Sequence, residues 1–508
     1  MSVKKNLTIL ALASVGTVAV AAYPASLYVA GQVYDKTLAK FEKDFLLTKN
    51  ISNYSYKEDA SKSGFFGRSG VITFDVENLP PIVKEKYKDK ENYKTIRLNV
   101  DTSFGFLSAK SKVRPDYNFG LGEIINDYLD ISETIDVNFN LHTNTDVEYS
   151  SKIDSIKLNK NGKELLQGDL NIEETKMSVV RNYSLISNDI DTALKHIDEG
   201  KIEGTSELKV KNITFMSNIG DAFPIDMTIK DLNSVVNYVY DLPMTSNTKV
   251  DSVVVNFKDD KSASSKEVFA SKNIVITTDL LRNKDTYAWN YVIKSEHLKA
   301  NYDKIKVKLA NFNFDIGLVN LDKDALKQSI DLYAKYSDYS ANAKLYENTD
   351  SRDGNEEVIF EYLDEIENFF TKPKQVQLSD FSFDLALNHD DANACIKDKG
   401  NIKMNGIGHI FVEKESTSEE ESLFKQDSNS TITLDKNFIY NFANATENCS
   451  AVKGIMDFAT ENFVKGGYIS KVDDAHYKVT VETTKKSEIF INGKKLEDVV
   501  KNVLGGGF

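Results

Sequence analysis

The sequence predicts an α+β protein with a single N-terminal transmembrane helix, followed by an elongated, mostly antiparallel β-rich body that includes a helical hairpin and C-terminal helices. Three observations predict this architecture. Residues 6–34 carry no charged side chain, and apolar and polar residues alternate with period two between about residues 64 and 321. Apolar residues at helical spacing then interrupt the strands in the last third of the chain.

The first element is a membrane anchor, predicted for residues 1–31. Lys4 and Lys5 precede residues 7–30, which are mostly apolar, and about 20 such residues cross a bilayer core of about 30 Å. Because basic residues stay on the cytoplasmic side, residues 31–508 are expected beyond the membrane. A cleaved signal peptide is the alternative, since Ala19-Val20-Ala21 carries the small residues that signal peptidase recognises. The length of the uncharged run favours the anchor.

The composition describes a folded, exported body. Hydrophobic residues make up 41% of the chain and there are only 7 prolines, which excludes a disordered protein. The net charge of −14 is spread along the chain and argues against a nucleic-acid partner. The only cysteines, Cys395 and Cys449, would be free to pair in an oxidising compartment. Two separate buried thiols are the alternative, because the sequence does not place their Cα atoms.

Residues 32–320 are predicted to form a strand-rich body. The alternation in residues 135–141 describes an antiparallel strand with one wet face, and residues 71–76 show a similar pattern. Asn161-Gly162, between two apolar segments, predicts a type I′ hairpin turn. Residues 307–316 and 376–385 share one alternation, which suggests a sheet extended by repetition, although strands also resemble one another by chance.

The remaining ranges are a helical hairpin at residues 321–372, further strands at 373–434, and a closing unit at 435–508. The first arm of the hairpin repeats Leu326, Ile330 and Tyr333, and the second ends before Pro373. The closing unit contains a helical region over residues 436–464, two strands, the turn Asn492-Gly493 and a final short helix.

The sequence contains no recognisable catalytic motif, and we predict no enzyme activity, no cofactor and no metal site. Nucleophile elbows, phosphate-binding loops and local zinc motifs are all missing. His389-Asp390-Asp391 is the densest candidate for a metal site, and we interpret it as a solvated strand end. The apolar strand faces are therefore the main functional features. They must be covered by the protein's own helices, by a partner or by a hydrophobic ligand.

The chain resembles the YdgA-like family of bacterial envelope proteins, a family without an assigned activity. The resemblance depends on the basic start and anchor, on Gly64-Phe65-Phe66, and on a closing hairpin in which residues 480–482 are followed by residues 489–498, including Asn492 and Gly493. Two positions depart from the family pattern: residues 104–106 read Phe-Gly-Phe where many members carry His-Gly-Pro, and Ser63 replaces a frequent arginine. The resemblance implies an inner-membrane protein of a Gram-negative bacterium, with its N-terminus in the cytoplasm and residues 31–508 in the periplasm.

These observations favour a non-enzymatic envelope protein whose periplasmic body binds protein partners or further copies of itself. A carrier of lipid or another hydrophobic ligand, with the apolar strand faces lining its path, is the second hypothesis. An enzyme, for example a hydrolase, is a third and weaker hypothesis, because no set of acid, base and nucleophile is apparent.

Overall fold

The structure is a computed structural model. It describes residues 51–499 except residues 78, 80, 106–107, 141–145, 183–184, 186, 188, 218–224, 240–241, 259–264, 303, 333–365, 391–394 and 413–423. The predicted anchor lies outside the described residues. Within them, no helix has both the length and the apolar character that a membrane span requires. The chain divides into two compact units, with the boundary between Val210 and Lys211; residues 238–240 belong to the first unit.

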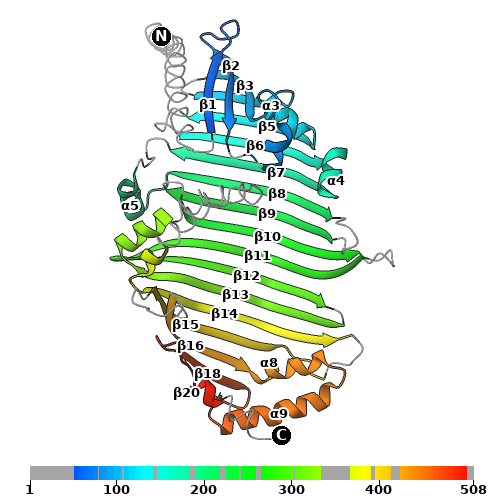
Figure 1. Cartoon of the computed structure of the whole chain (residues 1–508), viewed down its shortest axis with the longest axis vertical. Coiled ribbons are helices and arrows are strands. Elements are labelled where there is room, and N and C mark those ends of the chain that lie inside the picture. Colours follow the sequence, from blue (N-terminus) through cyan, green and yellow to red (C-terminus); the bar gives the residue numbers. More distant parts are fainter. Residues whose placement is uncertain are drawn as a thin grey trace, which may run out of the picture. The chain divides into compact units, whose positions relative to one another are not determined.

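The first unit is a meander of antiparallel strands in which each strand pairs with the next (Figure 1). The strands are β1 (Ile51–Glu58), β2 (Gly67–Val76), β3 (Thr95–Gly105), β4 (Ser108–Pro115), β5 (Leu129–Asn140), β6 (Asp146–Leu158) and β7 (Gly168–Asn182). The described helices of this unit are α2 (Pro81–Tyr87), α3 (Gly120–Asn126), α4 (Lys160–Leu166) and α5 (Ile190–Glu199). The buried side chains of Ile72, Phe74, Val100, Val113 and Val147 form a core cluster, so the alternating pattern predicted for residues 71–76 fills the interior.

The hairpin predicted at Asn161-Gly162 is wrong, because these residues lie inside helix α4. The side chain of Asn159 accepts a hydrogen bond from the backbone N–H of Gly162 at 3.1 Å and so caps the helix. Gly162 is buried, and a Cβ atom at this position would lie 2.2 Å from the carbonyl oxygen of Tyr128. The glycine therefore allows close packing instead of a turn. A capping asparagine two residues before Asn-Gly was the missed signal.

The second unit is also built from consecutive antiparallel strands, and Figure 1 shows β10 to β16 side by side. Most of these strands are long: β9 (Ile225–Val239), β10 (Leu242–Lys258), β11 (Ser265–Asn283), β12 (Thr286–Tyr302), β13 (Ile305–Leu321), β14 (Lys374–His389), β15 (Gly400–Val412) and β16 (Phe424–Asp435). Strand β8 (Gly204–Ser217) spans the boundary between the units. The prediction of a mostly antiparallel, β-rich body is confirmed.

The two segments with the repeated pattern lie in neighbouring strands. Residues 307–316 fall in β13 and residues 376–385 in β14, and Phe314 pairs with Phe381. Between these strands, residues 323–332 and 366–370 are helical. Within these helical segments, the side chains of Leu326, Ile330 and Phe369 are buried. The rest of the predicted helical hairpin lies outside the described residues.

The C-terminal part of the second unit contains the predicted helices and closing strands. These are α8 (Lys436–Asn441), the 3-10 helix η1 (Phe442–Ala445), α9 (Cys449–Lys465), β17 (Ser470–Lys471), β18 (His476–Thr483), β19 (Ile489–Ile491) and β20 (Lys494–Lys495). Asn492 and Gly493 link β19 to β20 with φ values of 47° and 76°. Positive φ at both positions is what a type I′ turn requires, so the predicted turn is confirmed.

A row of alternating carboxylates and amides crosses the polar face of the second unit. The side-chain amide of Asn311 donates to Asp384 at 2.8 Å, and that of Asn401 donates to the other oxygen of Asp384 at 2.9 Å. The backbone N–H of Asn401 donates to Asp435 at 2.8 Å, and the Asn273 amide donates to Glu296. We call these six residues the acid–amide ladder. The amides separate the carboxylates, which would otherwise repel one another on adjacent strands.

Two of the asparagines in this ladder have a left-handed backbone, and Asn311 lies at a bulge. Asn273 and Asn311 have φ values of 51° and 54°, a left-handed conformation that asparagine tolerates better than most residues. The register between β13 and β14 shifts between Ala310 and Asn313, which marks a bulge at this position. The asparagines therefore supply both the bulge geometry and the hydrogen bonds.

We predict that Asn401→Asp destabilises the second unit, because it places a third carboxylate between Asp384 and Asp435. The expected loss in the free energy of unfolding is about 1 kcal/mol, measured by urea denaturation of residues 31–508. The loss should shrink at high salt, which screens like-charge repulsion.

Asn247→Asp is the matched control for Asn401→Asp. Asn247 is an exposed asparagine on β10 that pairs with Thr277 rather than with an acid. The double variant Asn401→Asp/Asp384→Asn should recover stability, because it restores a carboxylate next to an amide. Equal midpoints for Asn401→Asp and Asn247→Asp would contradict the role of the ladder.

Candidate functional site

The candidate site is the apolar face of the second unit. Strand register aligns one apolar side chain from each of seven neighbouring strands, so that each pairs with the next. This apolar row consists of Ile276, Ile293, Phe314, Phe381, Met404, Ile432 and Val479. All seven side chains are half-buried. At about 4.8 Å between strands, the row is about 29 Å long.

Four phenylalanine rings cluster in the middle of this face. Phe381 lies edge-on to Phe312, Phe314 and Phe383, with ring centroids 6.1, 6.1 and 5.6 Å apart. Such edge-to-face pairs add to the stability that area burial provides. Phe381 therefore lies at the centre of an aromatic cluster in the middle of the row.

Helix α8 covers one end of the apolar face. Its Phe438 ring lies 6.0 Å from that of Phe383, and α8 contacts β14, β15 and β16. The helix approaches this closely because residue 400 is glycine: a Cβ atom there would lie 2.0 Å from the backbone nitrogen of Phe438. Asp435 caps α8 by accepting the Phe438 N–H at 2.7 Å. One carboxylate thus joins the helix to the acid–amide ladder on the other face.

A disulfide braces the start of helix α9. Cys395 and Cys449 are bonded, with Cα atoms 5.9 Å apart. Asn444 holds the same segment by accepting the N–H groups of Cys395 and Ile396 at 3.0 and 3.1 Å, and by donating to the Ile396 carbonyl at 2.9 Å. The N-terminal end of α9 is therefore fixed by a covalent bond and by a buried amide.

Helix α9 exposes an apolar ridge made of Ile455 and Phe458. These side chains are 65% and 64% exposed, and at i, i+3 spacing they share one helix face. The apolar residues that the sequence places at helical spacing, Val452, Met456 and Phe463, are half-buried instead. Helical spacing in the sequence marks the half-buried stripe, and a helical projection of residues 449–465 would also separate the exposed ridge from it.

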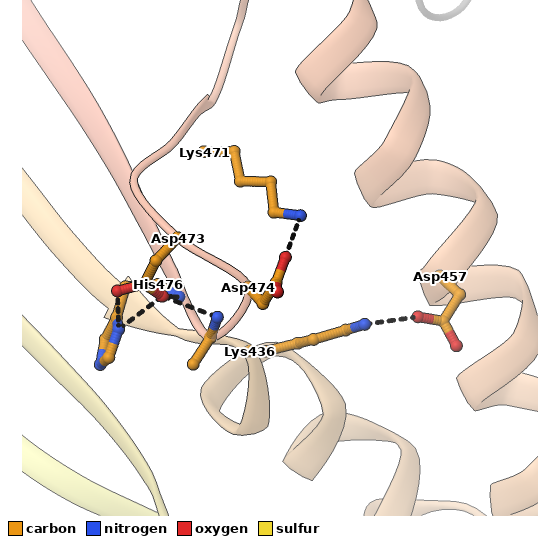
Figure 2. Close-up of polar contacts among 7 residues, drawn as sticks. Lys436, Asp457, Lys471, Asp473, Asp474 and His476 are labelled. Atoms are coloured by element: carbon orange, nitrogen blue, oxygen red, sulfur yellow. Dashed lines mark hydrogen bonds and ion pairs between the residues drawn. The ribbon is translucent and has the colours of Figure 1, made fainter.

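Charged side chains surround the turn that leads into β18 (Figure 2). Asp473 accepts the backbone N–H groups of Ala475 and His476 at 2.7 and 2.8 Å, and it lies 2.9 Å from Nδ1 of His476. The backbone hydrogen bond from Ala475, together with the side chain of His476, lowers the pKa of Asp473. This carboxylate is therefore ionised at neutral pH and organises the turn.

The neighbouring ion pairs are exposed and local. Lys471 lies 2.7 Å from Asp474 and, through its hydrogen bond, lowers the pKa of Asp474. Lys436 on α8 lies 3.6 Å from Asp457 on α9, as Figure 2 shows. Surface pairs of this kind contribute little to stability, and each carboxylate here has a local partner. We interpret the cluster as the structural support of the β18 turn.

A buried serine–histidine–glutamate cluster lies in the first unit. Ser187, His196 on α5, and Glu203 are 6%, 9% and 3% exposed. Nδ1 of His196 lies 3.1 Å from the Ser187 hydroxyl and 2.9 Å from Glu203, to which Ser187 also donates. A hydrolytic triad needs the serine on one ring nitrogen and the acid on the other. Because both partners meet Nδ1, the cluster is arranged to anchor α5 rather than to activate a nucleophile.

The residues singled out from the sequence belong to different units of the chain. Gly64, Phe65 and Phe66 form the turn between β1 and β2 in the first unit. Asn492 and Gly493 lie in the second unit, where the Asn492 side chain accepts the Thr480 N–H at 2.7 Å and donates to the Tyr468 carbonyl at 2.9 Å. Their roles are therefore those of two separate turns.

The candidate metal position near His389 does not gather ligands among the described residues. Asp390 pairs with Lys306, and Asp391 lies outside the part of the chain that the structure describes. No group of three or more histidine, cysteine or acidic side chains in the described part is placed to hold a metal ion.

Comparisons with known proteins give no relative. No family model matches the chain, and neither a curated protein nor a solved structure is significantly similar to it. Function must therefore be argued from the sites themselves.

We predict that the β18 turn loosens only in strong acid. Because the pKa of Asp473 is lowered in the folded state, its carboxylate stabilises the turn fully above the unfolded-state pKa of about 3.9. That contribution is lost as the pH falls through the lower folded-state pKa. The ¹⁵N-alanine amide signal of Ala475 should keep its position down to about pH 4 and move below it.

Two variants separate charge from hydrogen bonding at this turn. Asp473→Asn keeps an acceptor oxygen but cannot titrate, so its Ala475 signal should stay constant through the acid range. Asp473→Ala should lose the native signal at every pH. A midpoint at or above the unfolded-state value in the parent protein would show that the turn does not stabilise the anion.

Proposed function

We propose that this chain is a non-enzymatic protein of the Gram-negative cell envelope, whose periplasmic body binds protein partners or another copy of itself. The location is supported by the uncharged run at residues 7–30 after Lys4 and Lys5, and by the YdgA-like resemblance. The Cys395–Cys449 disulfide also fits an oxidising compartment.

The observation that carries the binding proposal is the exposed ridge on α9. Ile455 and Phe458 are largely exposed on a helix whose first turn is held by a disulfide. An apolar helix face of this kind is suited to a groove on a partner. Because α9 is already fixed in place, binding would lose little conformational entropy in ordering the helix.

Photo-crosslinking in the bacterial envelope tests this proposal. A photoreactive residue at position 458 should form a discrete product, either with a second copy or with one envelope protein, and Ile455→Asp should abolish it. The same residue at Lys284, an exposed turn position between β11 and β12, serves as the control. Equal products from both positions, or none from position 458, would contradict the proposal.

A second function, carriage of lipid or another hydrophobic ligand, is favoured by the apolar row. Seven aligned, half-buried side chains make a strip on which an extended acyl chain could lie. Among the described helices, α8 and η1 contact strands on this face near one end. The row is long enough for such a chain.

Lipid extraction tests carriage directly. Residues 31–508 are purified from periplasm and extracted for lipid, with an unrelated periplasmic protein as the background. The carrier function predicts stoichiometric phospholipid or fatty acid that Met404→Gln, in the apolar row, strongly reduces. Ile407→Gln on the opposite face of the same strand should retain it, since Ile407 is already 42% exposed. Lipid at background level would contradict the carrier function and leave protein binding as the only proposed function.

A further inference from the structure

The turn between β1 and β2 presents two adjacent phenylalanines to solvent. Gly64 and Gly67 form a bridge, in which the Gly64 N–H donates to the Gly67 carbonyl at 2.9 Å. Phe65 and Phe66 are the two residues between them, and their side chains are 47% and 69% exposed. The rings lie edge to face, with centroids 5.4 Å apart. We call these two residues the aromatic tip.

The backbone of the aromatic tip is fixed. The Phe66 carbonyl accepts the N–H of Phe104 on β3 at 2.8 Å. The guanidinium of Arg68 donates to the Gly64 carbonyl at 2.6 Å and lies over the Phe104 ring at 5.4 Å. Two exposed aromatic rings on an ordered turn are costly in water. They are also ready to enter an apolar phase without a further ordering cost.

The charges around the tip are nearly balanced. Arg68 lies 3.6 Å from Glu58, and Lys62 lies 3.7 Å from Asp59. The tip therefore offers apolar area without a strong electrostatic preference. That combination suits the water–lipid interface of a neutral bilayer, where aromatic side chains are enriched.

The proposed inner-membrane location places a bilayer within reach of the tip. Residues 31–50 separate the predicted span from β1, and a chain of about 20 residues extends at most about 70 Å. The tip follows one eight-residue strand beyond that point, a distance of about 27 Å. A tethered surface has a high effective concentration, which favours the bilayer over a dilute protein partner.

We propose that Phe65 and Phe66 insert into the interface of the lipid bilayer and form a second membrane contact for the first unit. This inference rests on the proposed location at the inner membrane. Its occupant is a lipid surface, whereas the α9 ridge is proposed to contact protein.

Vesicle binding tests the inference with residues 31–508 and vesicles of phosphatidylcholine. Phe65→Ser/Phe66→Ser should weaken partitioning by at least about tenfold. Leu281→Ser removes a comparably exposed hydrophobic side chain from β11 and should leave partitioning unchanged. Equal partitioning of the parent and the tip variant, or an equal loss in both variants, would overturn the inference.

Fluorescence gives a second readout that reports on the tip itself. The chain has one tryptophan, Trp289, so Phe66→Trp combined with Trp289→Phe leaves a single indole at the tip. Its emission should shift to the blue on adding vesicles and be quenched by brominated phosphatidylcholine. Leu281→Trp in the same background should show neither change. An unshifted spectrum for the tip variant would overturn the inference even if the body sedimented with vesicles.

These measurements use added vesicles and a body without residues 1–30, so they do not depend on where the protein resides in the cell. Failure of the tip test would leave the α9 crosslinking and lipid-extraction results untouched. Conversely, absence of α9 crosslinks would not change the partitioning of the tip variant.

Discussion

The second unit depends on strand register. A shift of one residue between two antiparallel strands would move every side chain of one strand to the opposite face. The apolar row and the acid–amide ladder lie on opposite faces of the same strands, so each shift would bury carboxylates and expose aromatic rings. The ladder also separates like charges, because Asn311 and Asn401 both donate to Asp384. Register is thus specified from both faces at once.

Asp435 connects this register to the helices. One of its oxygens accepts from Asn401 in the ladder, and the other accepts from Phe438 at the start of α8. Gly400 then allows the α8 backbone to lie against β15, where Phe438 meets Phe383. The position of α8 therefore depends on the hydrogen bond between Asn401 and Asp435 at the end of the β15–β16 pair. Helix α9 is held in turn by the disulfide and by Asn444.

Much of the fold could be predicted because period-two alternation is a local signal. Residues 71–76 and the Asn492-Gly493 turn carry their structure in adjacent residues, and both predictions are confirmed. The Asn161-Gly162 prediction was wrong because the same dipeptide also fits a helix when a capping residue such as Asn159 precedes it. The acid–amide ladder could not be predicted from the sequence. Its members are far apart along the chain, as Asn311 and Asp384 are, and they meet only when the strands pair in register.

The candidate sites also differ in how far the sequence predicts them. Phe65 and Phe66 could be singled out from the sequence, but their exposure depends on the Gly64–Gly67 bridge and on Arg68, which only the folded turn brings together. Ser187 comes from a loop, His196 from α5 and Glu203 from the segment just before β8, so their spacing in the sequence does not predict the cluster.

The arrangement of polar and apolar groups supports the proposal that the chain acts by binding. A catalytic group needs an ionisable side chain that is positioned yet incompletely satisfied, so that it can exchange a proton with substrate. Here Glu203, Asp435 and Asp473 each accept hydrogen bonds that hold secondary structure in place. Within the described part of the chain, the aromatic tip and the α9 ridge expose large apolar side chains. Both are held on rigid backbone, which lowers the entropic cost of association. Ordered, exposed hydrophobic side chains of this kind support the proposal that the chain contacts another surface.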